Sequence, residues 1–210
     1  MKIAVFGASG ATGIQVVQQA LDKGMAVKAF VRDPSKITLQ NPKLEIVQGD
    51  VLDPNTVEKV VQGVDAVILT LGSKPDTKAT MLAEGTNNIS SAMKKYGVLR
   101  LVVMSSYPMS GSDESMEFLK SVMPEDKIET FKPMIEDKIN QEKAVQESGL
   151  DWTIVRPMML TDGPKTDNYR VGEKLEVKPS DNISRADVAD FLLKTASDST
   201  WSLKIVTLTH

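Results

Sequence analysis

Three glycines near the start of the chain, Gly7, Gly10 and Gly13, have the spacing of a turn that binds dinucleotide phosphates. They follow an apolar run over residues 2–6 and precede apolar residues at helical spacing, as a strand–turn–helix unit requires. Side chains here would block a pyrophosphate or hold the helix off the strand, and free N–H groups at the helix start face the anion. The pattern predicts a dinucleotide site; the alternative is a tight turn without a ligand.

The residues after the second expected strand bear on the choice of dinucleotide. An arginine at this place can pair with the 2′-phosphate of NADP(H), whereas a carboxylate binds the ribose hydroxyls of NAD(H). The chain carries two cations, Arg32 and Lys36, with Asp33 between them. We therefore expect NADP(H) as the preferred cofactor, and Asp33 leaves NAD(H) open.

A second polar group follows the third expected strand. The side chain of Asp50 and the backbone N–H of Val51 are suited to hold the edge of an adenine ring. The alternative for this segment is a turn or a helix cap, and it applies more to Asp53, which precedes Pro54, than to Asp50.

Strands and helices alternate along the whole chain. Strands are expected at residues 3–6, 25–31, 44–47, 64–70, 99–104, 152–155 and 203–208. Helices are expected from the glycine turn to Gly24, from Pro54, and at residues 80–96, 135–146 and 185–196. Because such alternation needs crossover connections, it predicts a Rossmann-type doubly wound, mainly parallel sheet with helices on both faces, in one domain over residues 1–210.

Two stretches break the alternation, at residues 105–129 and 157–180. Ligands of doubly wound sheets bind beyond the carboxyl ends of the strands, and both stretches follow such an end. We therefore expect them to form the substrate wall. The alternative is a pair of surface loops without a chemical role.

The composition disfavours several kinds of site and partner. The chain has no cysteine and a single histidine, His210, so thiolate and histidine metal sites inside the fold are not expected. Its carboxylates resemble solvated helix faces, as at residues 136–138 and 141–143, and we expect no metal. A net charge of −3 without a basic block disfavours nucleic acid. We expect a cytoplasmic monomer or weak homodimer with no membrane span and no leader segment.

Several stretches, in order along nearly the whole chain, resemble the atypical short-chain dehydrogenase/reductase family, and most of all its flavin- and biliverdin-reducing members. The glycine motif alone identifies only the superfamily, whereas the spaced set is more specific. The matching stretches are residues 7–13, 31–33, 49–51, 65–68, 84–89, 105–106, 147–150 and 184–187.

The resemblance implies roles for residues around the cofactor. It places Ser9, Ala11 and Thr12 at the phosphates, Arg32 at the 2′-phosphate, Asp50 and Val51 at adenine, Leu71, Gly72 and Ser73 along the cofactor, and Met104, Ser105, Ser106, Pro157 and Met158 at the nicotinamide. Ser106 matches a family serine beside the nicotinamide, and Lys138 stands where many relatives have a lysine near the site. These two are the catalytic candidates; the alternative for Lys138 is one charge of an amphipathic helix.

Departures from the family pattern limit the chemistry. None of the three tyrosines has a lysine four residues later, so the usual Tyr-x-x-x-Lys acid–base pair is missing. Met159 stands where the biliverdin-reducing members have a histidine. The resemblance implies an NADPH-dependent reductase that passes hydride to a planar small-molecule acceptor such as a flavin (FMN), a quinone or a biliverdin-type tetrapyrrole. The alternative is a non-catalytic NAD(P)H sensor similar to the NmrA-like regulators.

Overall fold

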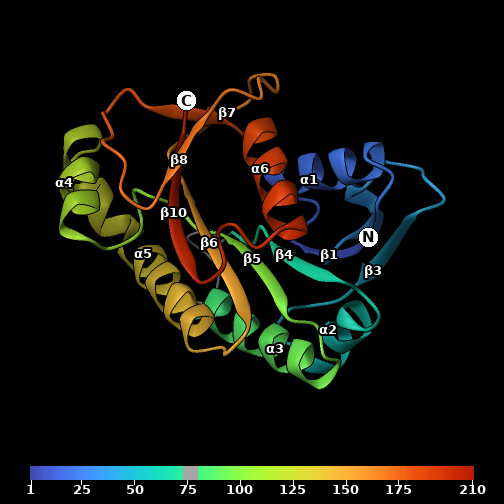
Figure 1. The fold of residues 1–210 in the computed structure, drawn as a ribbon. Helices are drawn as coiled ribbons and strands as arrows, with labels where there is room; N and C mark the ends of the chain where they lie inside the picture. Colours follow the sequence, from blue (N-terminus) through green and yellow to red (C-terminus); the bar gives the residue numbers. More distant parts are fainter. Residues whose placement is uncertain (73–79) are drawn as a thin grey trace.

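A computed structural model describes residues 1–72 and 80–210, and its centre is a sheet of eight strands (Figure 1). The strand order is β3-β2-β1-β4-β5-β6-β10-β8, and neighbouring strands are parallel apart from β8, which runs antiparallel to β10. The strands are β1 (Lys2–Phe6), β2 (Ala26–Val31), β3 (Leu44–Gln48), β4 (Ala66–Leu69), β5 (Arg100–Met104), β6 (Asp151–Pro157), β8 (Arg170–Gly172) and β10 (Lys204–Thr209).

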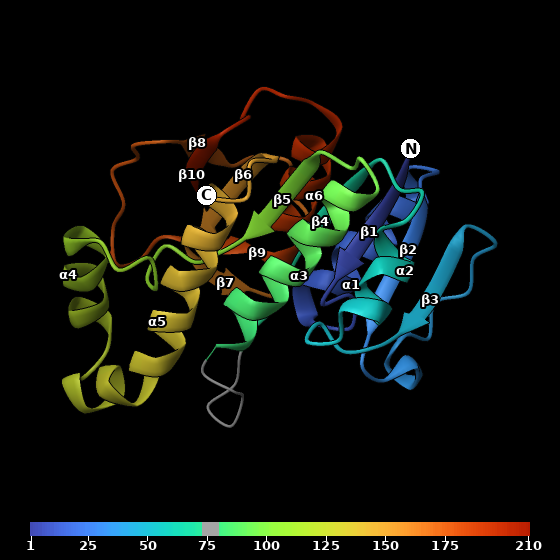
Figure 2. The same cartoon turned by 90° about the horizontal axis from the view of Figure 1, so that it is seen from below.

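Helices cover both faces of this sheet (Figures 1 and 2). One face carries α1 (Ala11–Asp22) and α6 (Arg185–Ser197), and the other carries α2 (Pro54–Val61), α3 (Met81–Lys95) and the long α5 (Glu125–Gln146). Alternate residues of β1 divide between the two cores: Ile3 and Val5 pack on one side, and Ala4 and Phe6 on the other. The predicted doubly wound, mainly parallel fold is confirmed.

The stretch at residues 105–129 differs from the irregular segment expected from the sequence. It contains α4 (Asp113–Val122) and the first turn of α5, which begins ten residues before the predicted start at residue 135. Pro133 lies inside α5, although an internal proline removes a helix hydrogen bond. Tertiary packing outweighs that cost, because methionines of this region cover a small apolar cluster formed by Leu119, Ile128 and Ile135.

The stretch at residues 157–180 also contains regular structure that the sequence did not predict. β7 (Met159–Thr161) pairs in parallel with β9 (Asn182–Ser184), which directly precedes α6, and β8 closes one edge of the main sheet. A short 3₁₀ turn (Pro34–Lys36) follows β2. Across residues 1–72 and 80–210, no helix is both long and apolar enough to cross a membrane.

Candidate functional site

A cavity of about 830 Å³ opens where the chain leaves the carboxyl ends of β1 to β5. Parallel strands bring these ends to one edge of the sheet, so segments far apart in the sequence share one wall. The lining residues are Gly7, Ser9, Gly10, Ala11, Thr12, Phe30, Val31, Arg32, Lys36, Asp50, Val51, Leu52, Thr70, Leu71, Gly72, Met81, Met104 and Arg185.

The glycine turn forms the part of this wall that is almost pure backbone. Gly7 has φ +80°, and a Cβ there would stand 2.7 Å from the carbonyl oxygen of Thr70. A Cβ on Gly13 would stand 2.1 Å from the carbonyl oxygen of Gly7, so Gly13 lets α1 approach β1 rather than lining the cavity. Gly10 is the N-cap of α1 and provides no side-chain acceptor for the first-turn N–H groups. These donors therefore suit an anionic group, as the sequence indicated.

At the end of β2, the two predicted cations and the carboxylate between them have different surroundings. Arg32 and Lys36 line the cavity. Asp33 does not: its Oδ1 accepts hydrogen bonds from the N–H (3.1 Å) and the hydroxyl (2.7 Å) of Ser35. The Ser35 hydroxyl, together with the Ser35 N–H, lowers the pKa of Asp33 from its ordinary value. One oxygen of the carboxylate that left NAD(H) open thus caps a local turn.

Asp50 and Val51 line the cavity after β3, and their contact with an adenine ring stays a prediction. The Oδ1 atom of Asp50 accepts the N–H of Leu52 at 2.9 Å, which fixes the turn. Val51 fits because Gly85 of α3 leaves room for it: a Cβ on Gly85 would lie 2.8 Å from Val51 Cγ2. Asp53 is the N-cap of α2 and accepts the N–H of Asn55 at 3.0 Å, so its alternative role as a cap is confirmed.

Lys138 is buried beside the cavity, so its alternative role as a solvated surface charge is wrong. Its Nζ lies 3.3 Å from the carbonyl oxygen of Leu71 and 3.5 Å from that of Met104, two residues that line the cavity. It also donates to Gln141 Oε1 at 3.0 Å. Burial lowers the pKa of Lys138 to about 8, against the raising effect of two nearby carboxylates on α5.

Asp137, Gln141 and Glu142 of α5 are buried as well, so the solvated face expected at residues 136–138 and 141–143 is present only at Glu136 and Lys143, which are exposed. Asp137 accepts the N–H groups of Leu82 (2.9 Å) and Ala83 (3.1 Å) and so caps the start of α3. Glu142 forms a two-pronged ion pair with Arg156 of β6. Partners on α3 and β6 satisfy these charges, and a helical pattern of charges does not reveal such partners.

Several predicted nicotinamide residues lie outside the cavity lining. Ser105 is buried and donates to Glu142 Oε1 at 2.5 Å, and Pro157 and Met158 are buried at the end of β6. Ser106 is partly exposed and does not line the cavity either. Ser73 lies outside the described residues.

Six lining residues were not predicted from the sequence: Phe30, Val31, Leu52, Thr70, Met81 and Arg185. Phe30, Leu52 and Thr70 are neighbours of predicted positions, and the ends of the strands were the available signal. Arg185 is different, because it comes from the start of α6, more than one hundred residues beyond the glycine turn. Residues 184–187 stood out as a family-like stretch, but no residue type in it indicated a contact with the cavity.

The groups around the cavity fit a nicotinamide dinucleotide better than a metal ion. The wall offers backbone N–H groups at a glycine turn for phosphates, two cations at one end, and the carboxylate of Asp50, which can accept hydrogen bonds from an adenine ring. Within the described ranges, no three His, Cys, Asp or Glu residues are grouped so that they could hold a metal.

Known proteins similar to this chain share its length to different degrees. An uncharacterized chloroplastic protein of Arabidopsis thaliana is 32% identical, with 98% of this chain and 75% of that protein aligned. The photosystem II assembly factor Ycf39 of Synechocystis is 27% identical, and the match covers 92% of this chain and 58% of the factor. A (4-alkanoyl-5-oxo-2,5-dihydrofuran-3-yl)methyl phosphate reductase of Streptomyces griseus is 29% identical over 74% of this chain and 46% of the enzyme.

Solved structures support the fold. ChuY, an anaerobilin reductase from Escherichia coli O157:H7, superposes with a TM-score of 0.81 at 22% identity, covering 99% of this chain and 96% of ChuY. A family model described as NAD(P)H-binding matches residues 7–199, which include the glycine turn, the strand ends that line the cavity and the whole of α6. The chain therefore belongs to the NAD(P)H-binding family of Rossmann-fold proteins.

Proposed function

We propose that this protein is an NADPH-dependent reductase that transfers hydride to a planar, unsaturated acceptor such as FMN, a quinone or a biliverdin-type tetrapyrrole. The observation that carries the proposal is the buried ammonium group of Lys138 beside Leu71 and Met104. Burying a lysine is costly, and a lysine whose pKa is perturbed beside a cavity is typical of a functional site. The reductase from Streptomyces griseus among the relatives agrees with this class of reaction.

NADP(H) is the preferred cofactor in this proposal. Arg32 and Lys36 both line the cavity where β2 ends, and such cations pair with a 2′-phosphate. Asp33, the residue that would favour NAD(H), does not line the cavity, and its Oδ1 accepts hydrogen bonds from Ser35.

The bound nicotinamide supplies the hydride, and the chain's own residues supply position and a proton. The glycine turn and the start of α1 bind the phosphates and fix the cofactor along the strand ends. The Nζ of Lys138 carries a proton below its pKa of about 8. Lys138 does not itself line the cavity, so it would give this proton to an oxygen or nitrogen of the acceptor by leaving the carbonyl oxygen of Leu71 or Met104. A hydride and a proton together complete a two-electron reduction, and Lys138 would regain its proton from solvent.

The test is turnover by the purified protein. NADPH is mixed with FMN, a soluble quinone or biliverdin, and the loss of reduced-cofactor absorbance is followed. We expect acceptor-dependent oxidation, with a loss of about 100-fold or more in Lys138→Met while NADPH binding is retained. Tight NADPH binding with no turnover on any acceptor would favour the sensor, for which the similarity to the assembly factor Ycf39 is the supporting observation.

Cofactor preference has its own measurement. A charge-assisted contact to a phosphate is worth about 1.5–3 kcal/mol, so Arg32→Ala should weaken NADPH binding roughly ten- to a hundred-fold and leave NADH binding nearly unchanged. Calorimetric titration of both nucleotides checks this. Equal losses for both would remove Arg32 from the 2′-phosphate.

A further inference from the structure

Arg185 brings a guanidinium group to the cavity, and the proposed function gives this group no role. It is the first residue of α6, and its side chain lines the same cavity as the glycine turn. One guanidinium nitrogen, Nη1, lies 2.6 Å from Asp162 Oδ1. The Asp162 side chain is 86% exposed, and an ion pair so open to water contributes little to stability. Among the described residues, the other guanidinium nitrogens of Arg185 have no protein partner.

The start of α6 packs against the last turn of α1. Both helices cover the same face of the sheet and begin at its carboxyl edge (Figure 1). Gln19 of α1 donates its Nε2 hydrogen to the carbonyl oxygen of Ala186 at 2.8 Å, which ties the first turn of α6 to α1. The first residues of the two helices, Ala11 and Arg185, both line the cavity, and each helix N-terminus carries partial positive charge.

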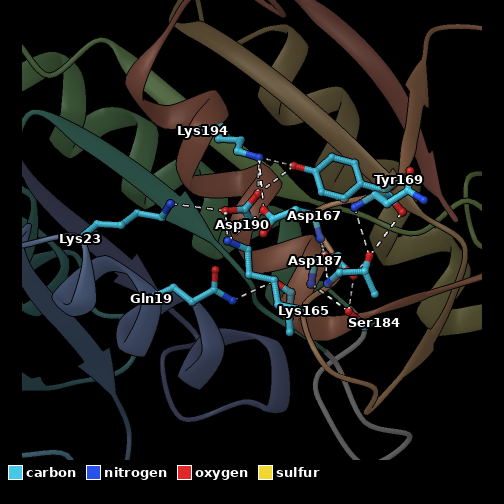
Figure 3. A network of polar contacts seen from close by, with 12 residues as sticks. Gln19, Lys23, Lys165, Asp167, Tyr169, Ser184, Asp187, Asp190 and Lys194 are labelled. Carbon is cyan, nitrogen blue, oxygen red and sulfur yellow. Dashed lines mark hydrogen bonds and ion pairs between the residues drawn. The ribbon is translucent and has the colours of Figure 1, made fainter.

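Asp187 holds the first turn of α6 in place (Figure 3). It is buried and accepts the N–H groups of Thr166 and Asp167, each at 2.9 Å, and the hydroxyl of Ser184 at 2.8 Å. Burial raises its pKa, but hydrogen bonds from the His210 ring, from Ser184 and from the backbone of the 166–167 segment outweigh burial and lower the pKa to about 2. The carboxylate therefore stays charged and fixes the segment that follows Asp162.

Asp190, one turn further along α6, binds cations from three parts of the chain (Figure 3). Its carboxylate lies 2.6 Å from the Nζ of Lys194, 3.0 Å from that of Lys165 and 3.4 Å from that of Lys23 on α1. It also accepts the hydroxyl of Tyr169 at 2.9 Å. Together, Asp187 and Asp190 join α6, α1 and the 165–169 segment, so the position of Arg185 at the cavity is set by a rigid frame.

We propose that Arg185 binds the pyrophosphate of the nicotinamide dinucleotide, between the starts of α1 and α6, and gives up its contact with Asp162 to do so. The inference rests on the proposed function, because it needs a dinucleotide in the cavity. A phosphate oxyanion is the shared chemistry, and a phosphate on the acceptor is the other possible source. The glycine turn in the same cavity wall favours the cofactor as that source.

NADPH and NADH both carry the pyrophosphate, whereas only NADPH carries the 2′-phosphate. The affinities for the two nucleotides therefore distinguish a pyrophosphate contact from a 2′-phosphate contact. Titration calorimetry of Arg185→Gln, without any acceptor, should show NADPH and NADH both bound roughly ten-fold more weakly. Arg32→Ala should instead affect NADPH alone. Arg185→Lys should lose less than Arg185→Gln, because it keeps the charge but not the planar fork.

Asp162→Asn is the matched control, since it removes the same ion pair and leaves Arg185 free. We expect it to bind both nucleotides at least as tightly as the wild type. If it weakens binding as much as Arg185→Gln, the loss comes from the broken ion pair and the inference is overturned. Unchanged affinities of Arg185→Gln for both nucleotides also overturn the inference. This holds even if the KM for a phosphate-bearing acceptor rises, because Arg185 would then bind the acceptor and not the cofactor. A wild-type protein that binds neither nucleotide would instead refute the proposed function.

Discussion

The two helix starts that border the cavity are built in opposite ways. The start of α1 is shaped by glycines and has no charged side chain in its first turn. The start of α6 carries Arg185 and is fixed by two buried carboxylates, Asp187 and Asp190, whose partners come from distant parts of the chain. The first is a local backbone requirement, and the second depends on tertiary contacts. The wall at the glycine turn can therefore be predicted from residues 7–13 alone, whereas the wall at the start of α6 cannot be predicted from a short segment.

Gly13→Ala should give the largest effect, because it breaks the backbone side of this comparison. The new Cβ would stand 2.1 Å from the carbonyl oxygen of Gly7, a backbone atom that cannot move without separating α1 from β1. We expect a loss of about 3 kcal/mol in the free energy of unfolding, measured by urea denaturation, together with loss of NADPH binding. Gly10→Ala is the control: its Cβ would lie 3.2 Å from the same oxygen, so the fold should survive. Equal destabilisation by both would contradict this account of the turn.

Asp190→Asn tests the start of α6, which is held by buried carboxylates. It should lower the free energy of unfolding by about 2 kcal/mol and not more, because the lysine partners of Asp190 are partly exposed and regain water. Hydrogen bonds from Lys194 and its neighbours outweigh burial and hold the pKa of Asp190 below its ordinary value. A depressed carboxyl pKa contributes stability above the unfolded pKa of about 4, and this is lost as pH falls. The difference between wild type and variant should therefore shrink in acid unfolding curves. A difference independent of pH would show that the Asp190 charge is not what stabilises the frame.

The cavity residues that can be predicted from sequence are those fixed by local backbone structure, and those that depend on tertiary contacts cannot be predicted. Gly7, Arg32 and Asp50 line one cavity because each follows a strand, and parallel strands end at one edge whatever the details of packing; their contacts with a cofactor stay predictions. Arg185 was missed because only the packing of α6 against α1 brings it to that edge. Lys138 was ambiguous in sequence, since a charge on a helix is usually solvated and only the structure shows its burial.

The buried Lys138 should give a smaller effect, which is a free energy of unfolding that rises with pH. Its folded pKa of about 8 lies below its ordinary value of 10.5, so the unfolded chain binds more protons between these pH values. Stability contributed by this residue should therefore rise with pH, by about 2 kcal/mol between pH 7.5 and pH 9.5. The check is the difference in unfolding free energy between wild type and Lys138→Met at both pH values. A difference that stays constant would mean that the lysine titrates normally.

Ser106→Ala should have the smallest effect. The side chain is partly exposed and does not line the cavity, so any contact with an acceptor is a single neutral hydrogen bond. Losing one costs about 0.5–1.5 kcal/mol, or roughly ten-fold or less in the rate of FMN reduction. Stopped-flow measurement of hydride transfer checks this. A thousand-fold fall with NADPH binding intact would make Ser106, and not Lys138, the proton donor.

The buried polar face of α5 has a consequence for how this helix tolerates change. Asp137, Gln141 and Glu142 each satisfy a group on another element, whereas Asn140 and Lys143 face solvent. All five are hydrophilic, so a hydropathy profile ranks them as equally replaceable. A saturation library of this helix should instead show two classes of polar position: permissive ones, and ones as restrictive as the leucines of a core. Conservative exchanges such as Glu142→Gln would then be selected against even though they keep size and polarity.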